Sequence, residues 1–193
     1  MTGLPARAIT RAAFDENALC SHSDNDWSGC RDARLRCLFD AWMSLRGDRL
    51  IPHRSALDCA AISALLPYVW ICRLEPETGR FRFRLAGEEI RWLVGKPVAG
   101  ATVEDLLPDI AAPFNKALRA VLTRPALCYF RGLIPHVDLF SIETESLALP
   151  LSDGDRATTV LAATVFAWPS TRAVRGAALA GQKVPTLIPV ADL

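Results

Sequence analysis

RFRFRLAG, residues 80–87, alternates arginine with apolar side chains and ends on a glycine. Strict alternation is typical of a β-strand that buries one face and exposes the other. The preceding segment, YVWICRLE at residues 68–75, is rich in aromatic and β-branched residues, and only a short PETG turn separates the two. We therefore predict an antiparallel hairpin, in which Gly87 permits a sharp exit from the second strand.

The register of this hairpin follows if Glu75 faces Arg80. The apolar face would then carry the pairs Leu74–Phe81, Cys72–Phe83 and Trp70–Leu85. The other face would place Arg73 directly opposite Arg82, and an acidic side chain, a partner surface or a ligand should offset this repulsion. Arg73, Arg80 and Arg82 are therefore candidates for an interaction surface, with a solvated face assisted by Glu75 as the alternative.

Residues 30–168 contain the remaining elements of one domain. Residues 31–48 predict an amphipathic helix that ends at Gly47, with an apolar stripe of Leu35, Leu38, Phe39, Trp42 and Leu45. A second helix would begin at Asp58 and end at Pro67. Three helical segments are expected at 88–95, 101–109 and 113–123, and three strands at 126–134, 141–151 and 157–168. This order predicts an α+β domain with one antiparallel sheet.

The composition is that of a globular protein, with 51% hydrophobic and 22% charged residues and a net charge of +1. The near-neutral charge argues against a protein whose whole surface is built for nucleic acid, although it leaves room for a local basic patch. The hairpin disfavours nucleic-acid binding by such a patch, because Phe81 and Phe83 would lie on the face opposite the arginines, whereas a base-stacking platform needs both on one face.

The flanking segments and the cysteines suggest a location. Residues 1–29 are polar and turn-rich and predict a flexible tail, and residues 169–193 contain three prolines and predict an irregular one. No apolar run approaches the ~20 residues of a membrane span, and the N-terminus lacks the apolar segment of a secretory signal. Six scattered cysteines without a C-x-x-C pair then indicate reduced thiols in the cytoplasm.

The chain resembles a PAS domain, and more closely a family of small bacterial proteins with a single PAS domain. The resemblance spans residues 31–168 and rests on Trp42, Arg46-Gly47, Ile51-Pro52-His53-Arg54, Leu57-Asp58, Leu66-Pro67, Phe83-Arg84-Leu85-Ala86-Gly87, Gly95, Gly100 and Leu149-Pro150-Leu151. It implies a five-stranded antiparallel sheet, helices between strands two and three, and a leading N-terminal helix. It also implies a role in sensing a signal or regulating a partner.

The resemblance further implies a space between the sheet and the helices, where PAS domains hold cofactors or metabolites. The residues expected around this space are Phe83, Leu85, Trp92, Phe114 and Leu118. Such large apolar side chains could equally fill it. No cofactor can be named: residues 113–123 contain no histidine for haem, and the asparagine-cysteine-arginine motif of flavin photosensors is absent from the sequence.

Two functions of different classes are consistent with the sequence. The first is a sensory or regulatory module without its own output domain, which acts on a signalling protein partner and is gated by a small ligand. Its leading helix would either cover the sheet or pair Trp42 with a second copy in a homodimer. The second is a protein that binds an anionic metabolite through Arg84 or Arg131, because guanidinium groups suit carboxylate and phosphate.

Catalysis is not expected from the sequence. Glu143 and Glu145 share one face of a strand, but no nucleophile or metal-ligand set accompanies them. They are interpreted as a solvated face or as acids that meet arginines. Cys128 is the best candidate for a reactive thiol because Arg131 is near, although sheet packing explains it more simply.

Overall fold

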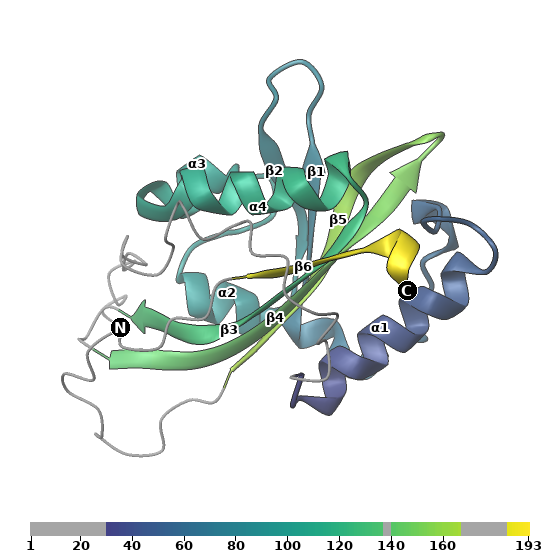
Figure 1. Ribbon diagram of the computed structural model, residues 1–193. Coiled ribbons are helices and arrows are strands. Elements are labelled where there is room, and N and C mark those ends of the chain that lie inside the picture. The colour runs from purple at the N-terminus through teal and green to yellow at the C-terminus, as the bar shows by residue number, and fades with distance from the viewer. Residues whose placement is uncertain (1–29, 137–139, 167–184) are drawn as a thin grey trace.

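The computed structural model describes residues 30–136, 140–166 and 185–193. Their strands form one antiparallel sheet in the order β2-β1-β5-β4-β3-β6 (Figure 1). The strands are β1 (Val69–Leu74), β2 (Phe81–Ala86), β3 (Ala126–His136), β4 (Phe140–Asp153), β5 (Arg156–Phe166) and β6 (Thr186–Pro189). The predicted α+β class is confirmed, with six strands in place of five.

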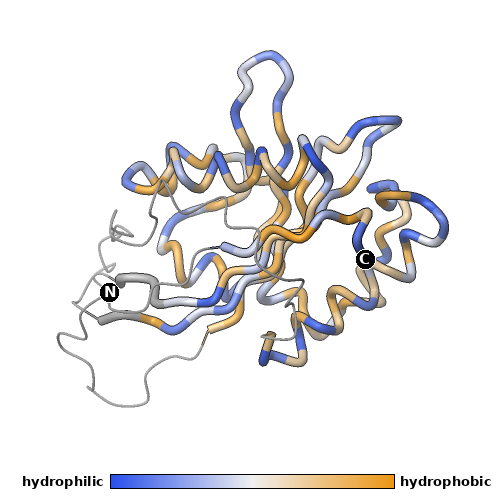
Figure 2. The backbone as a smooth tube through the Cα atoms, in the orientation of Figure 1, coloured by the Kyte–Doolittle hydropathy of each residue, from blue (hydrophilic) through white to orange (hydrophobic). Residues whose placement is uncertain are grey.

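Helices pack on both faces of this sheet. The α-helices are α1 (Ala33–Arg46), α2 (Glu88–Val94), α3 (Val103–Leu106) and α4 (Ala111–Thr123). The short 3-10 helices are η3 (Arg54–Ala56), η4 (Ser63–Tyr68), η5 (Pro108–Ile110) and η6 (Val190–Asp192). Two buried apolar clusters result, one between the sheet and α2–α4 and one between the sheet and α1. Figure 2 shows hydrophobic residues along the central strands and hydrophilic residues at the hairpin tips.

Helix α1 covers one face of the sheet with the predicted apolar stripe. Asp32 caps its first turn by accepting a hydrogen bond from the Arg34 amide, and Gly47 ends it with φ 54°. The Trp42 side chain is fully buried, and its indole N–H donates to the Pro150 carbonyl at 2.9 Å. The stripe is thus occupied within one chain, so Trp42 is not the exposed residue that a partner surface or a helix-mediated dimer would need.

The hairpin has the predicted register near its turn but not at its base. A β-bulge shifts the pairing, so that Ile71 pairs with Leu85 and Trp70 with Ala86. Arg84 is the extra residue, because Cys72 already pairs with Phe83. The prediction that Leu85 faces the α2–α4 helices is therefore wrong, since the bulge turns it toward the cluster under α1.

Gly87 has a different role from the predicted one. Its φ of −64° is open to any residue, so the exit from β2 does not need the conformational freedom of glycine. A Cβ at this position would instead overlap the backbone carbonyl oxygens of Leu66 and Pro67. The Gly87 amide also donates to the Val69 carbonyl at 2.8 Å. Glycine is required here because two backbone segments approach closely.

The predicted second helix is not an α-helix. Asp58 accepts a hydrogen bond from the Ala60 amide at 2.8 Å, but it caps only a turn. The following residues form the 3-10 helix η4, which contains Pro67. Proline has no amide hydrogen and clashes with the carbonyl four residues before it, so an α-helix through Pro67 is disfavoured.

The C-terminal segment supplies a strand where an irregular tail was predicted. Residues 186–189 pair with residues 126–129 of β3. Proline is tolerated in such an edge strand, because its missing donor can face away from the ladder. Residues 1–29 and 169–184, also predicted as tails, lie outside the described residues.

Candidate ligand-binding cavity

A cavity of about 120 Å³ lies between the sheet and helices α2 and α4. Its strand-borne lining includes Trp70, Phe83, Cys128, Phe130, Ser146, Ala148 and Thr164, and its helix-borne lining includes Ile90, Leu93, Phe114, Ala117, Leu118 and Val121. The sequence left open whether large apolar side chains fill the space between sheet and helices. In the structure they leave this cavity. Among the described residues, those that line the cavity carry no formal charge.

Three side chains form a polar cluster on the wall of this cavity. The Trp70 Nε1–H donates to Thr164 Oγ1 at 3.0 Å, and the hydroxyl oxygens of Thr164 and Ser146 are 2.9 Å apart. One of the two hydroxyl hydrogens lies between these oxygens, so the other remains available to a bound molecule. The cluster therefore offers an uncharged hydrogen-bonding point in an otherwise apolar cavity.

The structure brings some of the predicted pocket residues together and separates others. Phe83, Phe114 and Leu118 line the cavity. Trp92 does not, because α2 turns Ile90 and Leu93 inward and leaves Trp92 67% exposed. Leu85 lies on the other face of the sheet, as described above.

The sequence analysis did not predict the polar cluster, although hydroxyl residues in two apolar strand segments could have indicated it. Ser146 begins the otherwise apolar segment SLALPL, and Thr164 lies within VLAATVF, each two residues from an alanine on the same face of its strand. A hydroxyl at an inward-facing strand position needs a partner, which makes such residues candidates for a buried polar site. The sequence alone could not show that these two residues contact each other, because that depends on the order of the strands in the sheet.

Cys128 lines the cavity as an unreactive thiol. Burial raises its pKa to about 12, so its thiolate is scarce near neutral pH. Arg131, the neighbour that suggested reactivity, lies on the opposite side of β3 because side chains alternate along a strand.

This environment predicts a labelling pattern. With iodoacetamide at pH 8, the exposed Cys37 and Cys59 should react within minutes, whereas the buried Cys72 and Cys128 should react only after unfolding in urea. Peptide mass mapping of native and unfolded samples measures this. Rapid labelling of Cys128 in the native protein would contradict the packing described for the cavity.

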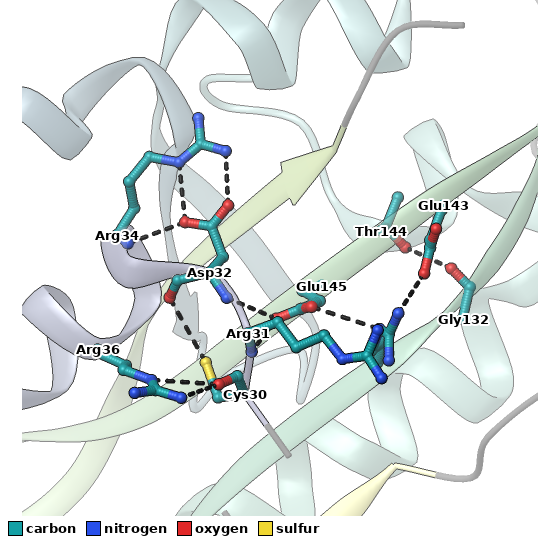
Figure 3. A network of polar contacts seen from close by, with 10 residues as sticks. Cys30, Arg31, Asp32, Arg34, Arg36, Gly132, Glu143, Thr144 and Glu145 are labelled. Atoms are coloured by element: carbon teal, nitrogen blue, oxygen red, sulfur yellow. Dashed lines mark hydrogen bonds and ion pairs between the residues drawn. The ribbon is translucent and has the colours of Figure 1, made fainter. Parts of the chain in front are cut away.

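Arg131 is held by two glutamates on the α1 face of the sheet. Its Nη2 lies 2.5 Å from Glu143 Oε1 and its Nε lies 3.3 Å from Glu145 Oε1. Glu145 Oε2 also accepts hydrogen bonds from the amides of Arg31 and Asp32, at 3.0 and 3.2 Å, next to the first turn of α1 (Figure 3). Arg131 is therefore not placed to hold an anion in the cavity. Of the two interpretations given for Glu143 and Glu145, the structure favours the second: both pair with an arginine.

The opposed arginines of the hairpin meet acidic side chains of the same chain. Arg73 Nη2 lies 2.8 Å from Asp153 Oδ2, and Arg82 contacts both carboxylate oxygens of Glu75, at 2.6 and 3.0 Å. These hydrogen bonds from Arg82 lower the pKa of Glu75. Arg80 is exposed. The acid expected from the sequence is thus present within the fold, and Arg73 and Arg82 have partners without a second protein.

The described part of the chain offers neither a metal site nor a membrane-spanning helix. Within it, no group of three or more histidine, cysteine, aspartate or glutamate residues could hold a metal ion. The helices of these same residues are too short or too polar to span a membrane.

Comparison with known proteins places the chain in a family. A family model described as PAS domain matches residues 31–164. No curated protein matches the chain. Similar solved structures include VqmA bound to DPO (TM-score 0.45, 18% identity, covering 56% of each chain) and the Vibrio cholerae VqmA dimer in the absence of target DNA (TM-score 0.45, 19% identity, covering 58% of this chain and 52% of that one).

A light-oxygen-voltage domain studied with a flavin analogue is also similar, with TM-score 0.40 and 16% identity over 59% of this chain and 89% of that one. The chain spans just over half the length of the VqmA structures that it matches. The family model covers most of the present sequence, from Arg31 to Thr164. The chain therefore belongs to the PAS domain family.

Proposed function

We propose that this chain is a sensory module that binds a small, uncharged, largely apolar molecule in the cavity between the sheet and the helices. The observation that carries the proposal is the cavity of about 120 Å³, whose described lining is apolar and contains no charged side chain. Enclosing an ion there would remove it from water without a compensating partner. A ligand with an anionic group is disfavoured in this cavity, because Arg84 and Arg131 do not line it.

The polar cluster defines one feature of the ligand. Thr164 and Ser146 retain a hydroxyl hydrogen for a bound acceptor, so a carbonyl, a hydroxyl or a ring nitrogen would satisfy it. Phe83 and Phe114 flank Trp70, with ring centroids 5.8 Å from the indole, and support a flat or flexible apolar body.

Helix α2 is the element that we propose transmits binding to a protein partner. Its inner residues Ile90 and Leu93 line the cavity, while Trp92 on the same helix is 67% exposed. A ligand that displaces the inner face of α2 would therefore change how Trp92 is presented. In this proposal the chain performs no catalysis and acts through its partner.

Binding can be tested with 1-octanol as an uncharged probe and 15N-labelled protein. We expect saturable shifts at the amides of Ser146, Ala148 and Thr164. Ala117→Phe should abolish them, because Ala117 lines the cavity and the phenyl ring would occupy it. Ala112→Phe is the matched control, since Ala112 lies on the same helix and is exposed. Absence of saturable shifts in the wild type, or unchanged binding by Ala117→Phe, would refute the proposed cavity.

A further inference from the structure

A second hollow, of about 470 Å³, lies on the α1 face of the sheet beside η3. Its apolar lining is Leu57, Ile71, Leu85 and Leu151, and its polar lining is Arg54, Arg73, Arg84 and Thr159. An apolar floor beneath several guanidinium groups differs in kind from the uncharged cavity. The two sites lie on opposite faces of the sheet, since strand residues alternate between them.

Local features of the chain build this hollow. The β-bulge in the β1–β2 pair turns Leu85 into its floor and leaves Arg84 as the extra residue. On the other side, the Ser152 amide donates to the Pro52 carbonyl at 2.9 Å and the Gly154 amide contacts His53 Nε2 at 3.3 Å. These contacts fix the segment that carries Arg54 against the β4–β5 turn.

The hollow has more positive than negative charge. Each of two carboxylates serves two arginines: Glu75 lies near Arg82 and Arg84, and Asp153 lies near Arg73 and Arg54. Arg82 does not line the hollow and also has Asp105 as a nearby acid. The three arginines that line the hollow share Glu75 and Asp153, so positive charge remains in excess there. The longer contacts belong to Arg84, at 3.3 Å, and Arg54, at 3.8 Å, so these two retain unused donors.

Thr159 provides an independent observation. It is 1% exposed, it lines the hollow, and its Oγ1 has no hydrogen-bond partner in the described structure. It pairs with Arg73 across the β1–β5 ladder, which places both side chains on the same face of the sheet. A buried hydroxyl without a partner is unfavourable, and an oxygen-bearing ligand in the hollow would satisfy it.

We propose that this hollow binds a small organic carboxylate with an apolar body. Arg54 and Arg84 hold the carboxylate through charge-assisted hydrogen bonds, and Ile71 and Leu85 contact the apolar body. An inorganic anion would leave the apolar floor unused, and an uncharged molecule would leave the excess charge unpaired. The volume lies within the roughly 300–1,000 Å³ of small-molecule sites, which favours a small molecule over an acidic protein segment. This inference does not depend on a ligand in the other cavity.

Titration of the 15N-labelled protein with sodium octanoate tests the inference. We expect saturable shifts at the amides of Ile71, Leu85 and Thr159. Arg84→Gln and Arg54→Gln should each weaken octanoate binding by roughly tenfold, as for the loss of a charged hydrogen bond. Arg80→Gln is the matched control, because Arg80 is an exposed arginine of the same hairpin that does not line the hollow. Its affinity should equal that of the wild type.

Further arms separate this site from the cavity and from other occupants. Ala117→Phe should leave octanoate binding at the hollow intact, and 1-octanol should not shift the hollow amides. The inference is overturned if octanoate produces no saturable shifts there, or if Arg80→Gln weakens binding as much as Arg84→Gln. It is also overturned if an acidic peptide shifts these amides and octanoate does not, because the occupant would then be a protein.

Discussion

Trp42→Ala is expected to lower the free energy of unfolding by about 3–5 kcal/mol, the range for truncating a large buried aromatic side chain. Trp42 is fully buried between α1 and the sheet. Truncation would leave a void and would also remove the donor to the Pro150 carbonyl, a buried contact. Urea unfolding followed by circular dichroism measures the loss.

Trp92→Ala is the matched control for this experiment. The chemical change is the same, but Trp92 is 67% exposed, so the free energy of unfolding should change by less than about 0.5 kcal/mol. Similar destabilisation by both substitutions would contradict the different burial of the two tryptophans. A wild-type midpoint for Trp42→Ala would mean that α1 does not pack on the sheet as described.

Gly87→Ala should be among the most damaging changes that add a single methyl group. The added Cβ would overlap the carbonyl oxygens of Leu66 and Pro67, which belong to the backbone and cannot turn away. We expect destabilisation of about 3 kcal/mol, at the upper end of the usual cost of overpacking. Thermal unfolding by calorimetry would measure it.

Gly47→Ala separates steric overlap from the general cost of replacing glycine. Gly47 has φ 54°, but a Cβ added there would meet no atom within 4 Å. Because its ψ is −131°, outside the left-handed helical region, its replacement should cost about 1–3 kcal/mol, through backbone conformation alone. If Gly87→Ala proved milder than Gly47→Ala, the close approach between the end of β2 and η4 would not exist.

The alternation in residues 80–87 was sufficient to predict the hairpin, because a hydrophobic period of two residues is characteristic of a strand and not of a helix. It could not predict the bulge. The bulge leaves Arg84 unpaired and moves Leu85 from the apolar cluster under α2–α4 to the one under α1. Leu85 is in apolar surroundings with or without the bulge, so the hydrophobic pattern does not distinguish the two registers. The difference depends on packing against α1 and η4, which lie elsewhere in the sequence. For the same reason, β6 was not predicted: Pro189 within it and Pro185 before it argue against a strand, and its partner β3 lies far earlier in the chain.

The candidate site was only partly predictable. Phe83 and Leu118 follow from inward-facing positions on a strand and a helix, whereas the polar cluster depends on strand order. Trp70, Ser146 and Thr164 meet because β1, β5 and β4 are neighbours in the sheet. The opposed Arg73 and Arg82 correctly indicated that acids should lie nearby. One acid, Glu75, is close in sequence, but Asp153 is brought in by the fold.

The arrangement at the margins of the sheet determines how the protein can meet other molecules. Along β2, Phe83 exchanges backbone hydrogen bonds with Gly100 and Ala101, and along β3 residues 126–129 pair with β6. The strand left outermost, β6, has four residues and ends at a proline, which has no amide hydrogen to offer. Residues 130–136 of β3 pair with β4 on one side and, among the described residues, have no strand on the other, so this part of the edge can accept a foreign strand. Backbone pairing with another molecule is therefore most accessible along residues 130–136 of β3, and contacts elsewhere should proceed through side chains on helices and faces.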